Sequence, residues 1–359
     1  MTAGGDSGSV DLTVSIANRN GREFLRGCIE SIRSGTARVR YEVVVVDNAS
    51  TDGSCEMLRS EFPEVRIVAN ETPRGYGASH NQAFAVSRGR YFLVLNNDMV
   101  VHAGAFDAMF ERMERNDGIG VLGCRLHNPD GTLQASCSRE STLLRILVED
   151  LAPQGPFLER LGLQQRMRSW AHDVECDINV VQGSCMFMPR GVFDAVGRFD
   201  EQFDFFREEH DLCRRVKASG WRVVFFPGAT ITHFGGQTMK KIPQAALQAG
   251  FDSRYKYFAK HNGPFAATVV LCSAFTGVVL RWLSREAISM LRLARDPKDA
   301  RIQAAIYRGT VKWFFEPARP WSARERNRLS QWNVERVVTN SGQATPQLVL
   351  DRDETEKNH

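Results

Sequence analysis

Four short apolar runs, separated by polar turns and by segments with helical spacing, constrain the fold of this 359-residue chain most strongly. The runs are residues 12–17, 41–46, 65–69 and 91–95. Nearly continuous apolar runs of this length are typical of strands buried on both faces, as in a parallel sheet. Helices are expected over 22–34, after Asp52 and over 78–88. This alternation predicts βαβ units and an α/β fold.

Polar residues follow three of these four runs. They are Asn18-Arg19-Asn20, the segment 47–50 and Asn96-Asn97-Asp98. Because parallel strands end at one edge of the sheet, we expect a polar, partly acidic crevice for a ligand there. A carboxylate flanked by amides, as at Asp98, suits a hard divalent cation that is shared with substrate phosphates. The alternative is a polar turn that ends a core strand.

The absence of glycine-rich nucleotide-binding motifs and the low net charge argue against several classes of ligand. Neither the dinucleotide fingerprint GxGxxG nor the P-loop GxxxxGK[ST] follows the first strand, which argues against NAD and the phosphates of ATP. The net charge is only +4, and the first 240 residues contain no Lys/Arg block of the kind that forms a nucleic-acid groove. Eight cysteines without a CxxC pair predict reduced, mostly buried thiols of a cytosolic protein.

Several side chains have both a structural and a functional interpretation. Asp47 could accept from a base or ribose hydroxyl, or form an Asx-turn, and Asp52 could cap a helix. Gly75 lies in the loop Arg74-Gly75-Tyr76-Gly77 before a helix. A helix N-terminus approached through glycines favours anions, although an ordinary loop has the same composition.

The second half of the chain has an acidic cluster, Glu208-Glu209-His210-Asp211, at the start of a helix. Acidic residues in a first turn interact well with the helix dipole. Like charges at this spacing also raise one another's pKa, which suits a general base. His233 follows a strand and, with Asp98, would form half of a metal site with nitrogen and oxygen ligands. Before these, 139–176 is expected to be a lid or an acceptor-facing loop, and 177–188 a strand.

The order of the motifs resembles that of the family-2 glycosyltransferases of GT-A fold, especially their rhamnosyltransferase-like branch. The matching pieces are VSIANRNGREFLRGCIESI, EVVVVDNASTDGS, NETPRGYGASHNQAFAVSRGRYFLVLNNDMVV, QGSCMFMPRGVFDAVGRFDEQFDFFREEHDLCRRVKASGW and PGATITHFGG. The resemblance implies a Rossmann-like mixed sheet flanked by helices over 10–236. The nucleotide-sugar half would be about 10–100 and the acceptor half about 101–236.

The same resemblance implies an inverting transfer of a sugar, with rhamnose as the commonest suggestion, in cell-surface polysaccharide synthesis. The donor would be a dTDP-, UDP- or GDP-linked sugar, and the acceptor a glycan or a lipid-linked molecule. Asp98 and His233 would bind Mg²⁺ or Mn²⁺, and Glu209 would be the base. Asn96-Asn97-Asp98 has one acid, and Glu209 replaces the family's usual Asp, so Glu208 and Asp211 are alternative bases. The donor nucleotide would contact Ala17, Arg19, Asp47, Ser50, Gly75, Asn81 and Asn97.

The C-terminal third is expected to be helical over 237–335, between the catalytic domain and a disordered tail at 336–359; residues 1–9 would be a flexible tail. The run 265–280 is apolar but shorter than the about 18 residues that indicate a spanning helix. Beyond it, basic residues fall on one helical face: Arg281, Arg285, Arg292 and Arg295. This pattern favours a membrane interface, and the alternatives are packing on the catalytic domain or a dimer contact. The expected location is the cytoplasm, peripheral to the inner face of the cell membrane.

Two other functions remain open from the sequence. A nucleotidyltransferase is a fold neighbour, but no Gly-rich loop with a following basic residue occurs after the first strand. A catalytically inactive nucleotide-sugar-binding protein would not need the acids at 98, 208, 209 and 211.

Overall fold

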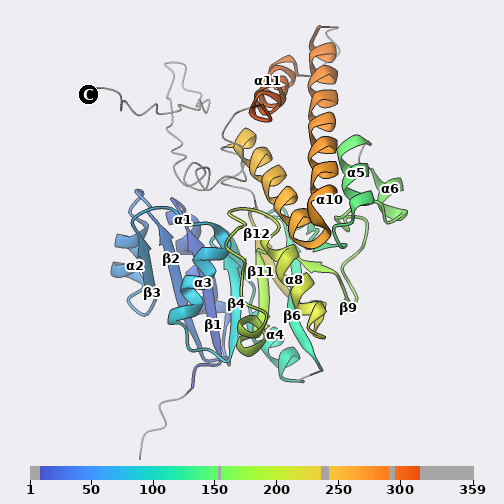
Figure 1. Ribbon diagram of the computed structural model, residues 1–359. Coiled ribbons are helices and arrows are strands. Elements are labelled where there is room, and N and C mark those ends of the chain that lie inside the picture. Colours follow the sequence, from blue (N-terminus) through green and yellow to red (C-terminus); the bar gives the residue numbers. More distant parts are fainter. Residues whose placement is uncertain (1–8, 116, 153–154, 236–241, 291–295, 316–359) are drawn as a thin grey trace, which may run out of the picture.

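The computed structural model describes residues 9–115, 117–152, 155–235, 242–290 and 296–315 (Figure 1). The strands and helices of the N-terminal half are β1 Leu12–Asn18, α1 Arg22–Gly35, β2 Tyr41–Asn48, α2 Ser54–Glu61, β3 Arg66–Asn70, α3 Tyr76–Val86, β4 Tyr91–Asn96, β5 Met99–Val101, α4 Ala105–Glu114, β6 Ile119–His127, β7 Leu133–Gln134 and β8 Cys137–Ser138. Those that follow are α5 Leu143–Leu151, α6 Pro156–Arg160, β9 Cys176–Asp177, β10 Val180–Val181, β11 Cys185–Pro189, α7 Arg190–Ala195, α8 Glu208–Ala218, β12 Arg222–His233, α10 Pro243–Met290 and α11 Pro297–Trp313.

The centre of the fold is one mixed sheet with the strand order β3-β2-β1-β4-β11-β6-β12-β5. The four predicted strands are confirmed, and β3, β2, β1 and β4 are parallel to one another. β11 then runs antiparallel to both β4 and β6, and β12 is parallel to β6. The chain places β2 on one side of β1 and β4 on the other. Ligands of open α/β sheets bind beyond the carboxyl ends of strands at such a reversal of order.

Helices cover both faces of this sheet, which explains the continuous apolar runs in the sequence. In β2, Val43 and Val45 pack into one core, and Val44 and Val46 pack into the other. The first core includes side chains of α1, α2 and α4, whereas the second includes side chains of α3, α7 and α8. Successive residues of a strand point to opposite faces, so a strand with two buried faces lacks the alternation of apolar and polar residues that a half-exposed strand shows.

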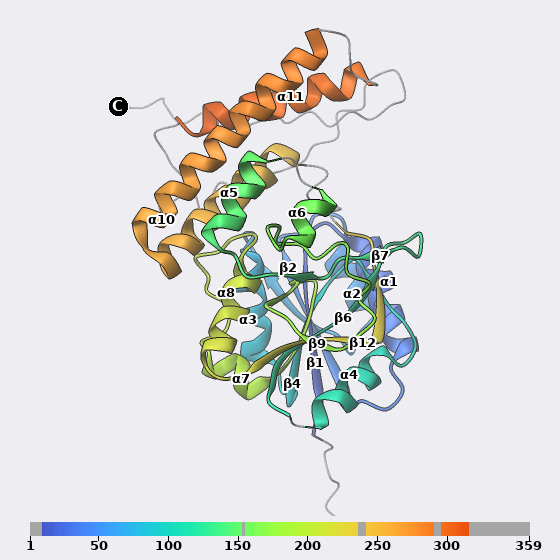
Figure 2. The ribbon, with the colours of Figure 1, turned by 90° about the vertical axis from the view of Figure 1, so that its right-hand side faces the viewer.

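A third layer of helices lies beyond the carboxyl ends of β1, β2 and β4 (Figures 1 and 2). α10 is two helical segments separated at Gly263, which has φ 85° and precedes Pro264. The first segment packs on the catalytic domain, where Tyr257 and Phe258 share a core with Ile146 and Phe203. The second segment extends away along α5 and α11. Ala267 and Val270, at the start of the second segment, belong to the same core, so this end of the predicted membrane-facing region packs on the catalytic domain.

Some local expectations are wrong. The predicted strand over 177–188 is three short pieces, β9, β10 and β11, because the turn at residues 182–184 interrupts it. α3 begins at Tyr76, two residues before its predicted start. α2 has Gly53 at its N-cap with φ 80°, whereas Asp52 accepts hydrogen bonds from the backbone N–H groups of Arg22 and Ser54.

The predicted reduced and mostly buried cysteines are found in the structure. All eight cysteines are free thiols, and five of them are buried.

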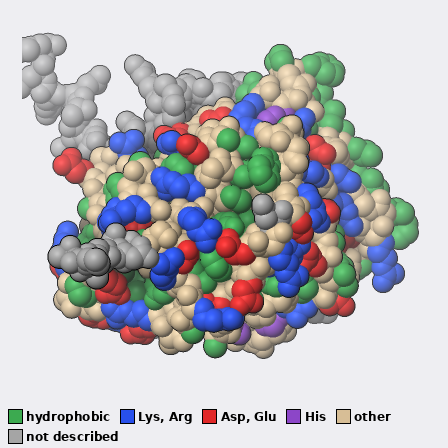
Figure 3. Space-filling view, turned by 90° about the horizontal axis from the view of Figure 1, so that it is seen from below, with side chains coloured by type: hydrophobic (Ala, Val, Ile, Leu, Met, Phe, Trp, Pro, Cys, Tyr) green, Lys and Arg blue, Asp and Glu red, His purple; other side chains and the backbone are tan. Residues whose placement is uncertain are grey.

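On the face of the molecule opposite the helical layer, basic and acidic side chains are interspersed (Figure 3). The predicted basic face at Arg292 and Arg295, and the predicted tails at 1–9 and 336–359, fall largely or wholly outside the described residues.

The contact between α5 and α10 generates a test of the third layer. A Cβ atom at Gly277 would overlap the carbonyl oxygen of Asp150, which is backbone and cannot move aside cheaply. We expect Gly277→Ala to lower the free energy of unfolding by about 1–3 kcal/mol, as overpacking does. Gly27 in α1 has open space around the same position, so Gly27→Ala should stabilise the protein by about 0.5–1 kcal/mol. Urea unfolding of both variants measures the difference, and equal effects would contradict the packing of α5 on α10.

Candidate functional site

The polar ends of β1, β2 and β4 meet in one hydrogen-bonded network, as the sequence predicts. Asn18 donates to the Asp47 carboxylate at 2.9 Å, and Asn97 donates to Asn18 at 2.7 Å. Asp47 also accepts from the backbone N–H of Ser50 at 2.9 Å; this bond reaches three residues along the chain and not the two of the expected Asx-turn. A carboxylate offers about four acceptor positions, so these bonds leave capacity for a ligand.

Two further donor-site candidates lie at the same edge. Ala17 is half-buried and pairs with Asn96 of β4. Arg19 follows β1, and burial lowers the pKa of its guanidinium. The network residues and these two therefore line one edge of the sheet, at the position where a crevice was expected.

Gly75 and Asn81 have structural roles that the sequence did not reveal. The backbone N–H of Tyr76 at the start of α3 donates to the carbonyl of Asp204 at 3.0 Å, so the first N–H of this helix is already engaged by the protein. A Cβ on Gly75 would come within 3.0 Å of Asp204 Cα. The Asn81 amide donates to the Phe199 carbonyl at 2.9 Å and accepts from its N–H at 3.1 Å. Both residues hold the segment 199–204, and we leave them out of the donor site.

Asp98 and His233 are adjacent, with His233 Nε2 at 3.2 Å from Asp98 Oδ1. The antiparallel pairing of β5 and β12 brings them together, with His233 opposite Met99. His233 Nδ1 lies 2.6 Å from Gln134 Oε1. Because an amide oxygen only accepts, Nδ1 carries a proton, and Nε2 faces Asp98. Such a partner on the other ring nitrogen is usual for histidines that ligate metals.

The pair fits a divalent cation only with help from a substrate. Within the described residues, no cluster of three or more His, Cys, Asp and Glu side chains could hold a metal. Mg²⁺ characteristically binds one or two carboxylates together with substrate phosphates and water, and imidazole and carboxylate ligands also suit Mn²⁺. The arrangement therefore provides an incomplete set of ligands for such an ion.

Tyr76 connects this pair to the acidic cluster. Its hydroxyl lies 2.9 Å from both Asn96 Oδ1 and the Gly183 carbonyl. Asn96 Nδ2 lies 3.2 Å from His233 Nε2. On the other side, a Cβ on Gly183 would lie 3.7 Å from Glu209 Cβ. Burial raises the pKa of the Tyr76 phenol well above its ordinary value, and the charges of Glu208 and Glu209 add to this effect. Tyr76 is thus a neutral hydrogen-bonding group between the metal pair and the acids.

Glu208 and Glu209 are carboxyl groups that the fold shields partly from solvent. Glu208 is buried and Glu209 half-buried, and the Oε2 atom of each is buried without a hydrogen-bond partner among the described residues. Burial raises the pKa of both groups, and the neighbouring Glu209 raises that of Glu208 further. The preceding Phe206 and Arg207 both have φ 69°, a conformation that costs energy in residues other than glycine and is found at functional sites. A carboxyl with a raised pKa is suited to proton transfer near neutral pH.

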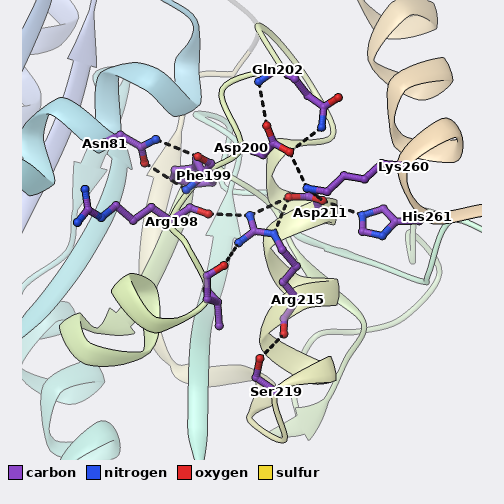
Figure 4. A network of polar contacts seen from close by, with 11 residues as sticks. Asn81, Arg198, Phe199, Asp200, Gln202, Asp211, Arg215, Ser219, Lys260 and His261 are labelled. Atoms are coloured by element: carbon purple, nitrogen blue, oxygen red, sulfur yellow. Dashed lines mark hydrogen bonds and ion pairs between the residues drawn. The ribbon is translucent and has the colours of Figure 1, made fainter.

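Asp211 has a different environment and does not suit the role of base (Figure 4). It is fully buried, and its carboxylate pairs with Arg215, Lys260 and His261, each at 2.7 Å. Lys260 and His261 belong to α10, so this ion-pair network joins α8 to the C-terminal helix. The structure therefore favours Glu208 or Glu209 as the base.

A cavity of about 320 Å³ distinguishes the two remaining acids. Glu209 lines this cavity, and Glu208 does not. The other lining residues come from 135–182, from the start of α8 and from the first segment of α10. The segment 139–176, expected to be a lid or an acceptor-facing loop, therefore forms part of a cavity wall beside Glu209.

Gln134 and Tyr76 were missed as site residues by reasoning from the sequence. Gln134 lies in a two-residue strand that follows a turn, and nothing in its local sequence links it to His233. Tyr76 was visible only as part of a glycine-containing loop, where the glycines suggested an anion site. Long-range packing, and not local pattern, gives both residues their positions.

The network around Asp211 generates a stability prediction. Asp211→Asn would leave the half-buried Arg215 and His261 without their carboxylate partner, whereas Lys260 would keep Asp200, so we expect the free energy of unfolding to fall by about 2–3 kcal/mol. Asp194 forms an exposed ion pair with Arg198, four residues along the chain, and Asp194→Asn should change the free energy of unfolding by about 0.5 kcal/mol or less. Urea unfolding at neutral pH measures both. Equal small effects would show that Asp211 does not hold α8 to α10.

Comparison with known proteins agrees with this geometry. The family model described as "Glycosyl transferase family 2" matches residues 13–196. The chain is 27% identical to N-acetylglucosaminyl-diphospho-decaprenol L-rhamnosyltransferase of Mycobacterium tuberculosis, over 69% of this chain and 81% of that protein. It is 25% identical to the O-antigen biosynthesis protein RfbC of Myxococcus xanthus, over 89% of this chain but 26% of that protein.

A solved structure shares the fold. The mannosyltransferase PcManGT from Pyrobaculum calidifontis, in complex with GDP-Man and Mn²⁺, has a TM-score of 0.50 and 14% sequence identity. The match covers 86% of this chain and 89% of that one. At this identity the likeness concerns the fold alone, and it agrees with the GT-A architecture described above. Since the family model covers more than half of the chain, the protein belongs to glycosyl transferase family 2 and is a glycosyltransferase.

Proposed function

We propose that the protein transfers a sugar, with inversion, from a nucleoside diphosphate donor to a glycan or lipid-linked acceptor in cell-surface polysaccharide synthesis. The observation that carries this proposal is the continuous arrangement from Asp98 and His233 through Asn96 and Tyr76 to Glu209. It places a candidate cation site and a candidate base on opposite sides of one tyrosine. The donor nucleotide would lie along the network of Asn18, Asp47, Ser50 and Asn97, with Ala17 and Arg19 beside it.

Glu209 is the proposed base because it alone of the acidic cluster lines the cavity with an unpartnered buried oxygen. Its carboxylate would accept the proton of the acceptor hydroxyl as that oxygen attacks the anomeric carbon. The new bond joins the acceptor oxygen to the anomeric carbon. The bond from that carbon to the donor phosphate breaks, and its electron pair leaves with the nucleoside diphosphate. A single displacement of this kind inverts the carbon.

Asp98 and His233 would hold Mg²⁺ or Mn²⁺, with the donor phosphates supplying further oxygen ligands. Such an ion would supply positive charge where negative charge develops on the departing nucleoside diphosphate. Gln134 keeps a proton on His233 Nδ1 and thereby orients the ring toward Asp98. The solved relative bound to GDP-Man and Mn²⁺ supports a divalent ion here.

The choice of acceptor rests on the relatives and on α10. The Mycobacterium tuberculosis relative is named for a lipid diphosphate acceptor, and the Myxococcus xanthus relative for O-antigen biosynthesis. Within the described residues, α10 is the one helix long and apolar enough to cross a membrane, a test that core helices of soluble proteins also pass. Its second segment exposes Phe265, Leu283 and Met290. We propose that this segment contacts the cytoplasmic face of the membrane, where a lipid-linked acceptor is available.

Two alternative functions are less well supported. A nucleotidyltransferase would release pyrophosphate from a nucleoside triphosphate, and an inactive binding protein would release nothing. The family assignment and the unpartnered acid at Glu209 favour glycosyl transfer over both.

Ligand binding tests the donor site. We expect dTDP, UDP or GDP to raise the melting temperature, with one base preferred and the shift dependent on Mn²⁺, because a ligand of the folded state stabilises it by mass action. Asp98→Ala should abolish the metal dependence. Gln134→Leu should require about 10–100 times more Mn²⁺, the usual cost of losing a partner of a metal ligand. If none of the nucleotides shifts the wild-type protein, the donor site is wrongly placed.

The pH dependence of activity tests the base. The base acts as a carboxylate, and burial raises the pKa of Glu209, so protonation removes activity at a higher pH than for an exposed glutamate. We therefore expect nucleoside diphosphate release to fall on acidification from above the ordinary glutamate range. Glu209→Gln should lower the rate by about 10²–10⁴-fold. Glu208→Gln should retain turnover and leave the acid limb in place, because burial and the charge of Glu209 raise the pKa of Glu208 further, so that Glu208 is already protonated where Glu209 titrates. The opposite pattern in the two variants would make Glu208 the base.

A further inference from the structure

The cavity beside Glu209 is lined by more cationic than anionic side chains. Four arginines line it, Arg166, Arg168, Arg207 and Arg254, against two carboxyl groups, Glu149 and Glu209. His210 adds no charge at neutral pH, because burial lowers its pKa well below the ordinary value. We call this space, defined by the four arginines and Glu209, the arginine pocket.

Three of these arginines have no carboxylate partner. Within the described part of the chain, no Asp or Glu oxygen lies within ion-pairing distance of Arg166, Arg168 or Arg207. Arg207 donates instead to the neutral side chains Ser141 at 2.7 Å and Gln165 at 2.9 Å. Burial lowers its pKa to about 10, and the charge of Arg254 contributes more to this lowering than Glu209 offsets. Unpaired guanidinium groups in a partly dry space favour a bound anion.

Unsatisfied polar atoms gather around the same cavity. Arg254 Nε, Gln164 Nε2, Gln182 Oε1 and Glu209 Oε2 are all buried and have no hydrogen-bond partner among the residues that the structure describes, and all four residues line the pocket. Buried polar groups are normally hydrogen-bonded, so an unsatisfied set around one cavity indicates a ligand. The arginine and Gln164 nitrogens can donate to an anion, whereas Glu209 Oε2 can accept from a hydroxyl.

We propose that the arginine pocket binds the phosphate of the acceptor, and that this acceptor is a sugar joined through a phosphate or diphosphate to a lipid. This inference rests on the proposed function, because it places the acceptor hydroxyl at Glu209. The phosphate would lie against the guanidinium groups of Arg166, Arg168 and Arg207, with Arg254, which already pairs with Asp150 at 2.6 Å, beside them. The sugar would lie between the phosphate and Glu209. The cavity volume of about 320 Å³ is in the range of small-molecule sites.

The lining also explains why the phosphate would carry a lipid. One wall of the pocket is apolar and consists of Phe206, Ala246, Leu247 and Gly250. Three of these residues belong to the first segment of α10, and the second segment of the same helix exposes Phe265 and Met290. A charged wall beside an apolar wall suits a headgroup that is attached to a hydrocarbon chain better than it suits a free inorganic anion.

Isothermal titration with geranyl diphosphate and with inorganic pyrophosphate tests the pocket. EDTA is present throughout, so that metal-dependent binding of phosphates at Asp98 and His233 is suppressed. We expect wild type and Asp98→Ala to bind geranyl diphosphate alike. The double variant Arg166→Gln/Arg168→Gln should bind it at least about tenfold more weakly, since each charged hydrogen bond is worth that much. Arg160→Gln is the matched control, because Arg160 is an exposed arginine of α6 that does not line the pocket.

The outcomes distinguish a lipid-linked phosphate, a free phosphate and the absence of an anion site in the pocket. Tighter binding of geranyl diphosphate than of pyrophosphate, lost in the double variant alone, supports a lipid-linked phosphate. Equal binding of the two probes overturns the lipid and leaves a free phosphate as the ligand. Binding of neither probe, or equal weakening in Arg160→Gln, overturns the pocket itself. Failure of the proposed function is distinguishable, because it would remove the metal-dependent thermal shift with nucleoside diphosphates, which this experiment does not use.

Discussion

The buried ion-pair network of Asp211 determines where the acidic end of α8 lies. Lys260 and His261 of α10 and Arg215 of α8 all meet this one carboxylate. On the opposite side, Asn81 of α3 holds the backbone of Phe199 through two hydrogen bonds. The segment 199–211 is therefore fixed between a helix of the nucleotide half and the C-terminal helix. Because charges removed from water must be paired, the two halves and α10 are held in one relative position.

This fixed position allows the protein to keep two carboxyl groups partly dry and unsatisfied. Glu208 and Glu209 follow two residues in the left-handed conformation, and each has a buried oxygen without a partner. Both features cost stability on their own. The packing and ion pairs around them offset that cost, and the result is a carboxyl group, Glu209, with a raised pKa next to a cavity. C-terminal residues thereby contribute to a site that the family pattern places in the first 236 residues.

The donor and acceptor sides of the site differ in how complete they are without substrate. On the proposed donor side, Asn18, Asp47, Ser50 and Asn97 are already joined by hydrogen bonds, and Asp98 and His233 could supply two of the ligands that a cation needs. On the proposed acceptor side, the arginine pocket has polar atoms that find no partner among the described residues. The first group is preorganised through its own hydrogen bonds, whereas an anion would satisfy the second.

The sequence alone determined the parallel N-terminal sheet and the polar edge at its carboxyl ends, because strand burial and the ends of apolar runs are local properties. It also singled out Asp98, His233 and Glu209, through the order of motifs. For several polar side chains that could be either structural or functional, only the tertiary structure showed which contacts they make. Asp211 is an ion-pair centre, Asn81 and Gly75 hold a loop, and Gln134 orients a histidine that lies far away in the sequence. The arginine pocket was likewise invisible, because its charges come from three separate segments whose proximity depends on how α10 packs.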